Sequence, residues 1–123
     1  MIRGIGLDVC DINRMRKAVS QKGFCERVFS AEEISYAESK ADPATHYAAA
    51  FAAREALSKA TGWGMAKLGI NSCTIERTKT GPRFVLDENT LSKFSDEGID
   101  NIFLTISHDA GIATAVVVLE KNQ

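Results

Sequence analysis

The chain has 123 residues, which is enough for one compact domain and leaves little room for a second. Hydrophobic residues make up 45% of the sequence and charged residues 25%, which are ordinary values for a globular protein. The net charge of −1 gives no overall attraction to nucleic acid or to a membrane surface, so we expect neither as a partner.

The cysteines and the apolar segments bear on where the protein acts. Three cysteines are an odd number, they are too widely spaced for a paired metal-binding motif, and only two histidines accompany them. These counts favour reduced thiols over disulfides or structural zinc. No apolar segment has the features of a signal peptide or the length of a membrane span. We therefore expect a cytoplasmic protein.

A strand is predicted over residues 2–9. The apolar side chains that alternate on one of its faces are Ile5, Leu7 and Val9. The other face carries Gly4 and Gly6, which allow a neighbouring backbone to approach closely. Asp8 lies on this glycine face near the end of the strand. Because an isolated carboxylate is costly to bury, Asp8 is expected to have a partner.

Three helices are predicted next, over residues 11–21, 30–39 and 42–61. Asp11 is a suitable N-cap for the first helix, and Ser30 with Glu33 forms a capping box at the start of the second. The third helix has Pro43 at its first position and Gly62 directly after its end. The second and third helices are thus marked by local chemistry at their boundaries.

A run of basic residues lies on and after the first helix. Between residues 14 and 27 there is one acid, Glu26, and the basic residues are Arg14, Arg16, Lys17, Lys22 and Arg27. This run can be a solvated helix face, or it can bind an acidic partner.

The second half of the chain is mainly strand. Strands are predicted over residues 70–79, 82–86, 102–108 and 112–120, and a helix over 88–97. Thr80-Gly81-Pro82 and Asp109-Ala110-Gly111 provide the turns. The order β-α-α-α-β-β-α-β-β indicates a single α+β domain, residues 1–123, with a mainly antiparallel sheet packed against the long alanine-rich helix.

The alanine-rich helix carries the residues that are suited to chemistry. Glu55 and Lys59 share a face with small alanines, which leave room for a bulky ligand. The pair can be an ordinary i,i+4 ion pair. With Asp8 as a second carboxylate, however, it can also hold Mg²⁺ together with substrate phosphates. Arg54 and Lys59 would then supply positive charge for those phosphates.

His108 ends a predicted strand and is either a turn residue or a group that stacks on a ring or donates to an anion. Ser107 and Asp109 flank it without forming a convincing catalytic triad. The chain has no G-x-S-x-G, P-loop or G-x-G-x-x-G sequence, which argues against a serine nucleophile and against P-loop or Rossmann nucleotide binding.

Taken together, these segments resemble the holo-[acyl-carrier-protein] synthases, the short, single-repeat class of phosphopantetheinyl transferases. The matching segments are Gly4-Ile-Gly-Leu-Asp8 with Arg14 downstream, Phe29-Ser-Ala-Glu-Glu33, Phe51-Ala-Ala-Arg-Glu-Ala-Leu-Ser-Lys59 followed by Gly62, Thr80-Gly-Pro82, and Ile106-Ser-His108. They occur in the order and at the spacing of that family and cover nearly the whole chain.

The resemblance implies transfer of phosphopantetheine from coenzyme A to a serine of apo-acyl carrier protein, with release of adenosine 3′,5′-bisphosphate. It implies that Asp8 and Glu55 are catalytic and hold Mg²⁺, and that Lys59 is catalytic and contacts phosphate. The other residues implied to bind coenzyme A are Arg54, Gly62, Gly81, Pro82 and His108, the last three at its adenosine 3′-phosphate end.

The resemblance also implies partners. Arg14 is expected to meet an acidic helix of the carrier protein, together with its basic neighbours Lys17 and Lys22. The family assembles as a homotrimer with coenzyme A between subunits, so a homotrimer is expected here. Deprotonation of the attacking serine is expected to pass through water near the metal.

Two departures from the family's pattern leave alternatives open. Arg54 stands where the family usually has Lys, and Ala50 stands where it often has Arg, so that one phosphate contact is either lost or replaced by Arg54. One alternative is a non-catalytic member of the same fold that binds carrier protein or coenzyme A. A second is a metal-dependent phosphotransferase that acts on nucleotides.

Overall fold

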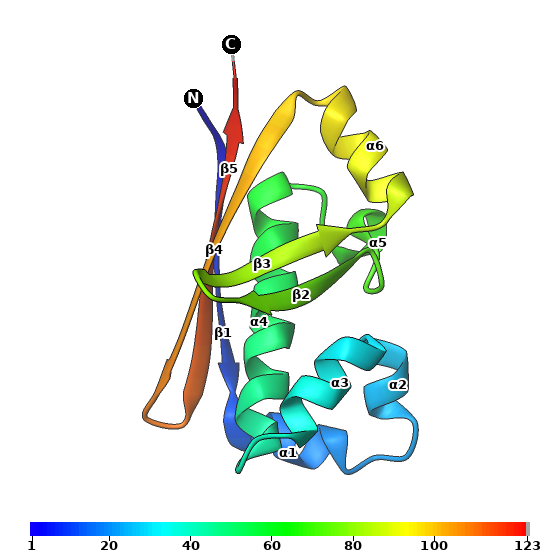
Figure 1. Ribbon diagram of the computed structural model, residues 1–123, viewed down its shortest axis with the longest axis vertical. Coiled ribbons are helices and arrows are strands. Elements are labelled where there is room, and N and C mark those ends of the chain that lie inside the picture. The colour runs from blue at the N-terminus through cyan, green and yellow to red at the C-terminus, as the bar shows by residue number, and fades with distance from the viewer. Residues whose placement is uncertain (123) are drawn as a thin grey trace.

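The computed structural model describes residues 1–122 and has the predicted α+β architecture (Figure 1). The strands are β1 (Ile2–Asp11), β2 (Cys73–Thr78), β3 (Gly81–Leu86), β4 (Ile99–Asp109) and β5 (Ile112–Lys121). The helices are α1 (Ile12–Val19), α2 (Phe24–Val28), α3 (Ala31–Glu38), α4 (Pro43–Thr61), α5 (Met65–Leu68) and α6 (Glu88–Asp96).

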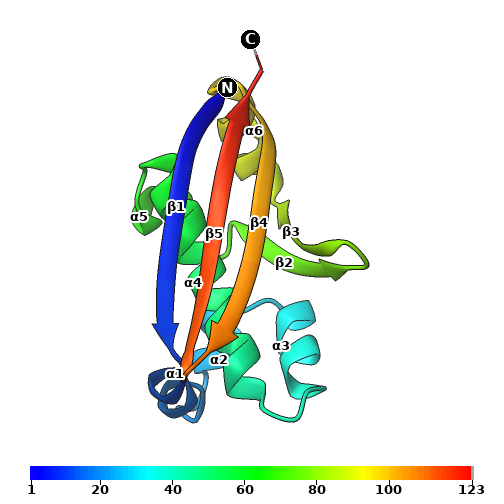
Figure 2. The same cartoon turned by 90° about the vertical axis from the view of Figure 1, so that its left-hand side faces the viewer.

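The strands form two antiparallel sheets. The larger sheet has the order β1-β5-β4, so β1 and β4 are its two edges, and β2 with β3 forms a separate hairpin. The long helix α4 lies across one face of the larger sheet, and the hairpin lies beside α4 on the side of β4 (Figures 1 and 2). The predicted antiparallel arrangement is therefore confirmed, with the hairpin as a second sheet.

The glycine face of β1 brings α4 unusually close. A Cβ added at Gly6 would lie 1.8 Å from the carbonyl oxygen of Ala56, and one at Gly4 would lie 2.0 Å from that of Ala60. Any side chain at either position would push the helix away from the strand, which only glycine avoids. The close backbone approach predicted from these two glycines is confirmed.

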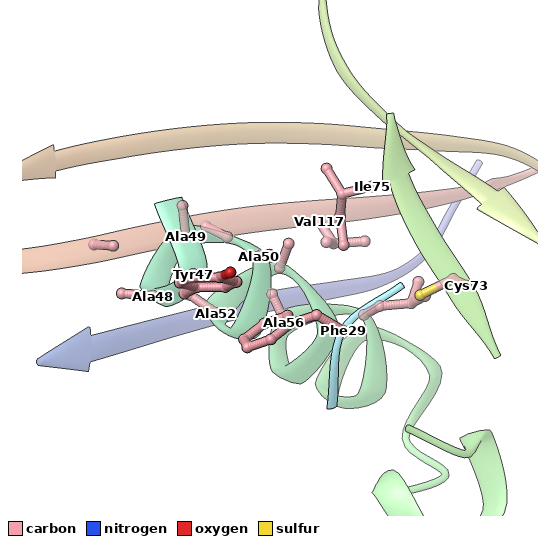
Figure 3. Packing of buried hydrophobic residues seen from close by; sticks show 14 of the residues in the cluster. Phe29, Tyr47, Ala48, Ala49, Ala50, Ala52, Ala56, Cys73, Ile75 and Val117 are labelled. Atoms are coloured by element: carbon pink, nitrogen blue, oxygen red, sulfur yellow. The ribbon is translucent and has the colours of Figure 1, made fainter. Parts of the chain in front are cut away.

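Small side chains of α4 fill the rest of this interface. Figure 3 shows Ala48, Ala49, Ala52 and Ala56 in the buried cluster, with Val117 of β5 packed on it. The residues of β5 that face α4 are almost completely buried: Ala113, Ala115, Val117 and Leu119. Because alanines and glycines keep the two backbones close, side chains at the end of β1 lie within reach of α4.

The predicted boundaries are confirmed where local chemistry set them. The Asp11 side chain accepts a hydrogen bond of 2.9 Å from the backbone N–H of Arg14, and Ser30 with Glu33 forms the capping box. Gly62 follows α4 in the left-handed region with φ 77°. Asp42 is different, because its side chain makes no capping bond to the helix backbone.

Several elements differ from the prediction. The short helices α2 and α5 were not predicted, because segments of this length show no helical period. The strand expected from residue 70 begins at Cys73 instead. The preceding residues form a turn in which Ser72 donates hydrogen bonds to the Gly69 carbonyl from its backbone and its side chain.

The other face of the larger sheet is uncovered and apolar (Figure 2). Large hydrophobic side chains exposed there include Ile5, Leu7, Val9 and Phe103. Within residues 1–122, no helix is both long and apolar enough to cross a membrane.

Candidate active site

The predicted catalytic residues meet where the end of β1 crosses α4. Asp8 lies on the glycine face of β1 with its side chain 16% exposed, and Lys59 projects from α4 with its side chain 56% exposed. The Lys59 ammonium lies 2.9 Å from Asp8 Oδ1 and donates a further hydrogen bond of 3.0 Å to the Leu7 carbonyl. The expected partner of Asp8 is therefore present, and it is Lys59.

Glu55, one turn before Lys59 on α4, shares this electrostatic environment. Burial raises the pKa of the Glu55 carboxyl, the Asp8 carboxylate raises it further, and Lys59 lowers it. The pKa of the Cys10 thiol is also raised, mainly by burial, and both Asp8 and Glu55 contribute. Two carboxylates far apart in the sequence thus act on one small region. No third His, Cys, Asp or Glu completes a metal-ion site with them within residues 1–122.

Gly62 lies just beyond Lys59 at the end of α4. It is exposed, and a Cβ added there would meet no atom within 4 Å. The backbone at this helix end is therefore open to a ligand that reaches Lys59. The contact of Gly62 with coenzyme A stays a prediction.

Arg54 does not face this site, and its predicted phosphate contact is corrected by the structure. Its side chain is 2% exposed and forms an ion pair with Glu33 of α3. It also donates hydrogen bonds of 3.0 Å to the carbonyl oxygens of Ile70 and Cys73. A guanidinium that is buried and neutralised in this way cannot bind a substrate phosphate, because it would have to leave Glu33 unpaired in the interior.

The sequence identified Glu33 only as a capping residue. In the structure, one of its carboxylate oxygens accepts from the Ser30 backbone N–H at 2.9 Å and from Arg54. The other accepts from the Ile75 backbone N–H at 2.7 Å. The Glu33–Arg54 pair thus joins α3, α4 and β2 (Figure 1).

A second cluster, which we call the cationic cluster, lies on the side of β4. It consists of Tyr36 on α3, Lys40 just after α3, His46 on α4, Arg77 on β2 and His108 on β4. Of these residues, sequence reasoning found His108 alone. The others are single basic or aromatic residues on separate elements, so no local pattern connects them.

Two further predicted residues, Gly81 and Pro82, lie beside this cluster. In the β2–β3 ladder, Pro82 pairs with Arg77 and Gly81 pairs with Thr78. The residues predicted to seat the adenosine 3′-phosphate end therefore lie on the side of β4, whereas Asp8 lies on β1 at the other edge of the sheet (Figure 2). Their contact with coenzyme A stays a prediction.

The basic residues of the first helix remain at the surface. Arg14, Lys17 and Lys22 are exposed, whereas Arg16 forms an ion pair with Asp42. The hydrogen bond from Arg16 lowers the pKa of Asp42 to about 2. Arg14 also borders a hollow of about 290 Å³. The residues that line the hollow are Val9, Cys10, Asp11, Arg14, Met15, Ala18, Phe24 and Phe51.

Sequence comparisons cover nearly the whole chain. The family model described as the 4′-phosphopantetheinyl transferase superfamily matches residues 4–116. The chain is 37% identical to the holo-[acyl-carrier-protein] synthase of Geotalea daltonii, over 98% of this chain and 100% of that protein. It is 39% identical to the one of Cytophaga hutchinsonii, over 99% and 100%.

Solved structures show the same fold. The holo-[acyl-carrier-protein] synthase from Neisseria meningitidis superimposes with a TM-score of 0.90 and 28% identity, over 98% of this chain and 100% of that chain. The one from Helicobacter pylori, in complex with coenzyme A, gives 0.82 and 33%, over 94% and 99%.

The fold and these matches define the chain as a transferase. It belongs to the 4′-phosphopantetheinyl transferase superfamily.

The buried pair gives a first prediction. Arg54→Met should lower the free energy of unfolding by about 3–5 kcal/mol, because Glu33 is left charged and unpaired in the interior. Urea denaturation at one fixed protein concentration measures this. The matched control is Arg83→Met, which removes the exposed Arg83–Glu76 pair and should cost less than about 1 kcal/mol. Equal losses in the two variants would contradict the structural role of Arg54.

Proposed function

We propose that this chain transfers the 4′-phosphopantetheine group of coenzyme A to a serine of apo-acyl carrier protein. The serine oxygen forms a bond to the phosphorus that carries the pantetheine arm. The bond from that phosphorus to the bridging pyrophosphate oxygen breaks, adenosine 3′,5′-bisphosphate leaves, and the hydroxyl proton passes to water. The observation that supports this most is the meeting of Asp8, Glu55 and Lys59 in a chain that matches holo-[acyl-carrier-protein] synthases end to end.

The residues present fit a magnesium ion. Asp8 raises the pKa of Glu55, so a cation that both carboxylates can reach is stabilised there. Two protein carboxylates are enough, because Mg²⁺ keeps several waters and takes phosphate oxygens from its substrate. When bound, the ion would neutralise charge on the pyrophosphate.

Lys59 has a role that follows from its exposure. Its ammonium neutralises Asp8 and keeps one donor free, because Nζ has three N–H groups and uses two on Asp8 and the Leu7 carbonyl. A pyrophosphate oxygen that arrives beside Asp8 can accept from the same ammonium. Lys59 would thereby hold the substrate and offset the negative charge that develops on the leaving group.

Two half-sites suggest that coenzyme A binds between copies of the chain. One is formed by Asp8, Glu55 and Lys59, and the other is the cationic cluster. Asp8 and His108 lie on opposite edge strands, and His46 and Glu55 are nine positions apart on α4. Nine positions correspond to about 13 Å along the helix and to nearly opposite faces. One coenzyme A therefore reaches both groups most directly when a second copy supplies one of them. The apolar outer face of the larger sheet is the surface on which we place the contacts of a homotrimer.

The carrier protein is the proposed partner of α1. This end of the molecule carries exposed positive charge on Arg14, Lys17 and Lys22. Within residues 1–122, none of the three forms an ion pair with an acidic side chain. The resemblance implies an acidic helix on the carrier protein, so charge complementarity favours docking here. Arg14 connects this surface to Cys10 and Val9, which directly follow Asp8.

The two alternatives have less support. Arg54 was the one sequence feature that favoured a non-catalytic member, and its pairing with Glu33 gives it a structural role instead. A nucleotide phosphotransferase would transfer or release phosphate without a carrier protein. The three cysteines are unpaired, which suits the cytoplasmic location that we propose.

The metal-site residues give the central prediction. Asp8→Ala and Glu55→Ala should each lower kcat/KM for transfer by at least about 100-fold, because several kcal/mol of charge stabilisation are lost. The mass gain of one phosphopantetheine on apo-carrier protein, with and without EDTA, measures transfer. Glu32→Gln, an exposed carboxylate on α3, is the control and should keep its rate. Wild-type transfer in either alanine variant, or in EDTA, would remove the metal site.

The docking surface gives a separate prediction. Arg14→Glu should raise the KM for carrier protein about tenfold and leave the KM for coenzyme A within about twofold, because like charges then face each other at the docking surface. Steady-state kinetics with each substrate varied in turn measures both. Lys93→Glu, the same charge change on α6, should alter neither KM. An equal effect of Arg14→Glu on both substrates would count against docking at α1.

The assembly can be tested with a matched pair of leucines. Leu7 on the outer face of β1 is 54% exposed and Leu91 on α6 is 53% exposed. Leu7→Asp should give a monomer by light scattering and lose transfer, because a carboxylate is costly to bury in an apolar interface. Leu91→Asp should leave the mass of the wild-type assembly unchanged. A wild-type protein that is monomeric at micromolar concentration would refute the trimer.

A further inference from the structure

The cationic cluster holds two positive charges on one aromatic ring. The Lys40 ammonium and the Arg77 guanidinium each lie 4.7 Å from the centre of the Tyr36 ring. A cation–π contact holds such a group in place without neutralising it. Among residues 1–122, neither Lys40 nor Arg77 has a partner in an ion pair.

The two histidines of the cluster lie in the same field. The His46 ring meets the Tyr36 ring edge-on at 5.4 Å, and His108 lies 6.4 Å from His46. Burial lowers the pKa of His46, and the positive charges of Arg77, Lys40 and His108 lower it further. The Asp42 carboxylate acts in the opposite direction and is the smallest of these influences.

Carboxylates on the neighbouring elements have other partners, and among residues 1–122 none forms an ion pair with Lys40 or Arg77. Their partners are Arg54 for Glu33, Arg16 for Asp42, Tyr47 for Glu38, Arg83 for Glu76, and the Ala110 backbone N–H for Asp109. The cluster thus keeps an excess of positive charge that an anion can neutralise.

Ala50 connects this cluster with a departure seen in the sequence. Many members of the family that this chain resembles have an arginine at the position of Ala50. Here Ala50 lines a small hollow together with Tyr36, His46 and Arg77. Arg54 cannot replace the missing charge, because it is buried on Glu33. Arg77 can, since it borders the same hollow from β2. The hollow holds only about 10 Å³, so an anion would lie outside it, where Arg77 is half-buried and Lys40 is exposed.

We propose that Arg77 and Lys40, held on the Tyr36 ring, bind the 3′-phosphate of coenzyme A and thereby replace the arginine that is absent at position 50. This proposal rests on the proposed function, because it assigns residues to one end of that substrate. A phosphate monoester carries close to two negative charges and three acceptor oxygens, and a guanidinium beside an ammonium matches both properties. Arg77 is also the ladder partner of Pro82, in the turn predicted to seat this end of the substrate.

Nucleotide binding tests the proposal without catalysis. Calorimetry on the full chain compares adenosine 3′,5′-bisphosphate with adenosine 5′-monophosphate, which lacks the 3′-phosphate. The wild-type protein should bind the bisphosphate more tightly than the monophosphate. Arg77→Gln should lower the affinity for the bisphosphate by at least about tenfold and the affinity for the monophosphate by less than about twofold. Lys40→Gln should act in the same direction. The control Arg83→Gln, on the strand paired with β2, should change neither affinity.

A second variant tests whether Arg77 takes over the charge of position 50. Ala50→Arg in the Arg77→Gln background should restore part of the preference for the bisphosphate, because the long side chain can carry a new guanidinium out to the surface beside Tyr36 and His46. If Arg77→Gln weakens both nucleotides equally or neither, or if wild type shows no preference, the assignment is wrong.

Transfer kinetics keep this result separate from the function itself. If the function and the assignment both hold, Arg77→Gln should raise the KM for coenzyme A more than it lowers kcat, and dephospho-coenzyme A should show no such rise. If wild type fails to modify carrier protein, the proposed function fails whatever the nucleotides show. If wild type transfers while the KM for coenzyme A is unchanged in Arg77→Gln, the function stands and the assignment falls.

Mixing two variants then tests which copy supplies the cations. Asp8→Ala lacks one half-site and Arg77→Gln weakens the other. If coenzyme A bridges two copies, mixed assemblies at limiting coenzyme A should exceed the sum of the separate activities. Activities that simply add would place both groups on one copy and overturn the assignment across the interface.

Discussion

The close approach of α4 to β1 is the constraint on which the candidate site depends. Gly4 and Gly6 allow the helix backbone to lie against the strand, where any Cβ would collide with carbonyl oxygens of Ala56 or Ala60. Asp8 continues the same face of the strand and therefore points at the helix that carries Lys59. Without this approach, a short aspartate could not reach across the interface to a lysine one layer away. The alanines of α4 serve the same purpose, since larger side chains would separate the two backbones.

Two consecutive residues of α4 have different roles, one structural and one in the candidate site. Arg54 and Glu55 are consecutive, and a helix turns by about 100° per residue, so they face different surroundings. Arg54 enters the interior and joins α3 and β2 through Glu33, whereas Glu55 faces Asp8. The interior pair fixes how α4 is rotated about its axis, because a small rotation would break three contacts of one guanidinium. That rotation in turn determines where Glu55 and Lys59 point, so a structural residue orients the chemical ones.

Much of this could be predicted from the sequence, and the remainder could not for identifiable reasons. The capping box at Ser30, the glycine face of β1 and the α4 boundaries depend on neighbouring residues, so local patterns were sufficient. The role of Arg54 depended on Glu33 and on carbonyl groups after α5, which are distant in sequence. Read beside Glu55, its charge suggested phosphate binding instead. The cationic cluster was missed for the same reason, because Lys40, His46 and Arg77 come together only through the packing of three elements.

The position of that cluster also supports the proposed assembly of several copies. β5 and α4 lie between the Asp8 edge and the His108 edge, and the side chains of this layer are almost completely buried. A substrate with a pyrophosphate at one end of its nucleotide and a phosphate monoester at the other would have to pass around this layer or bridge two copies. In the arrangement that we propose, the carboxylates of one copy and the cations of another face each other across a boundary. An outer sheet face rich in apolar side chains provides the means to hold such copies together. In this view, oligomerisation belongs to the construction of the site and is more than added stability.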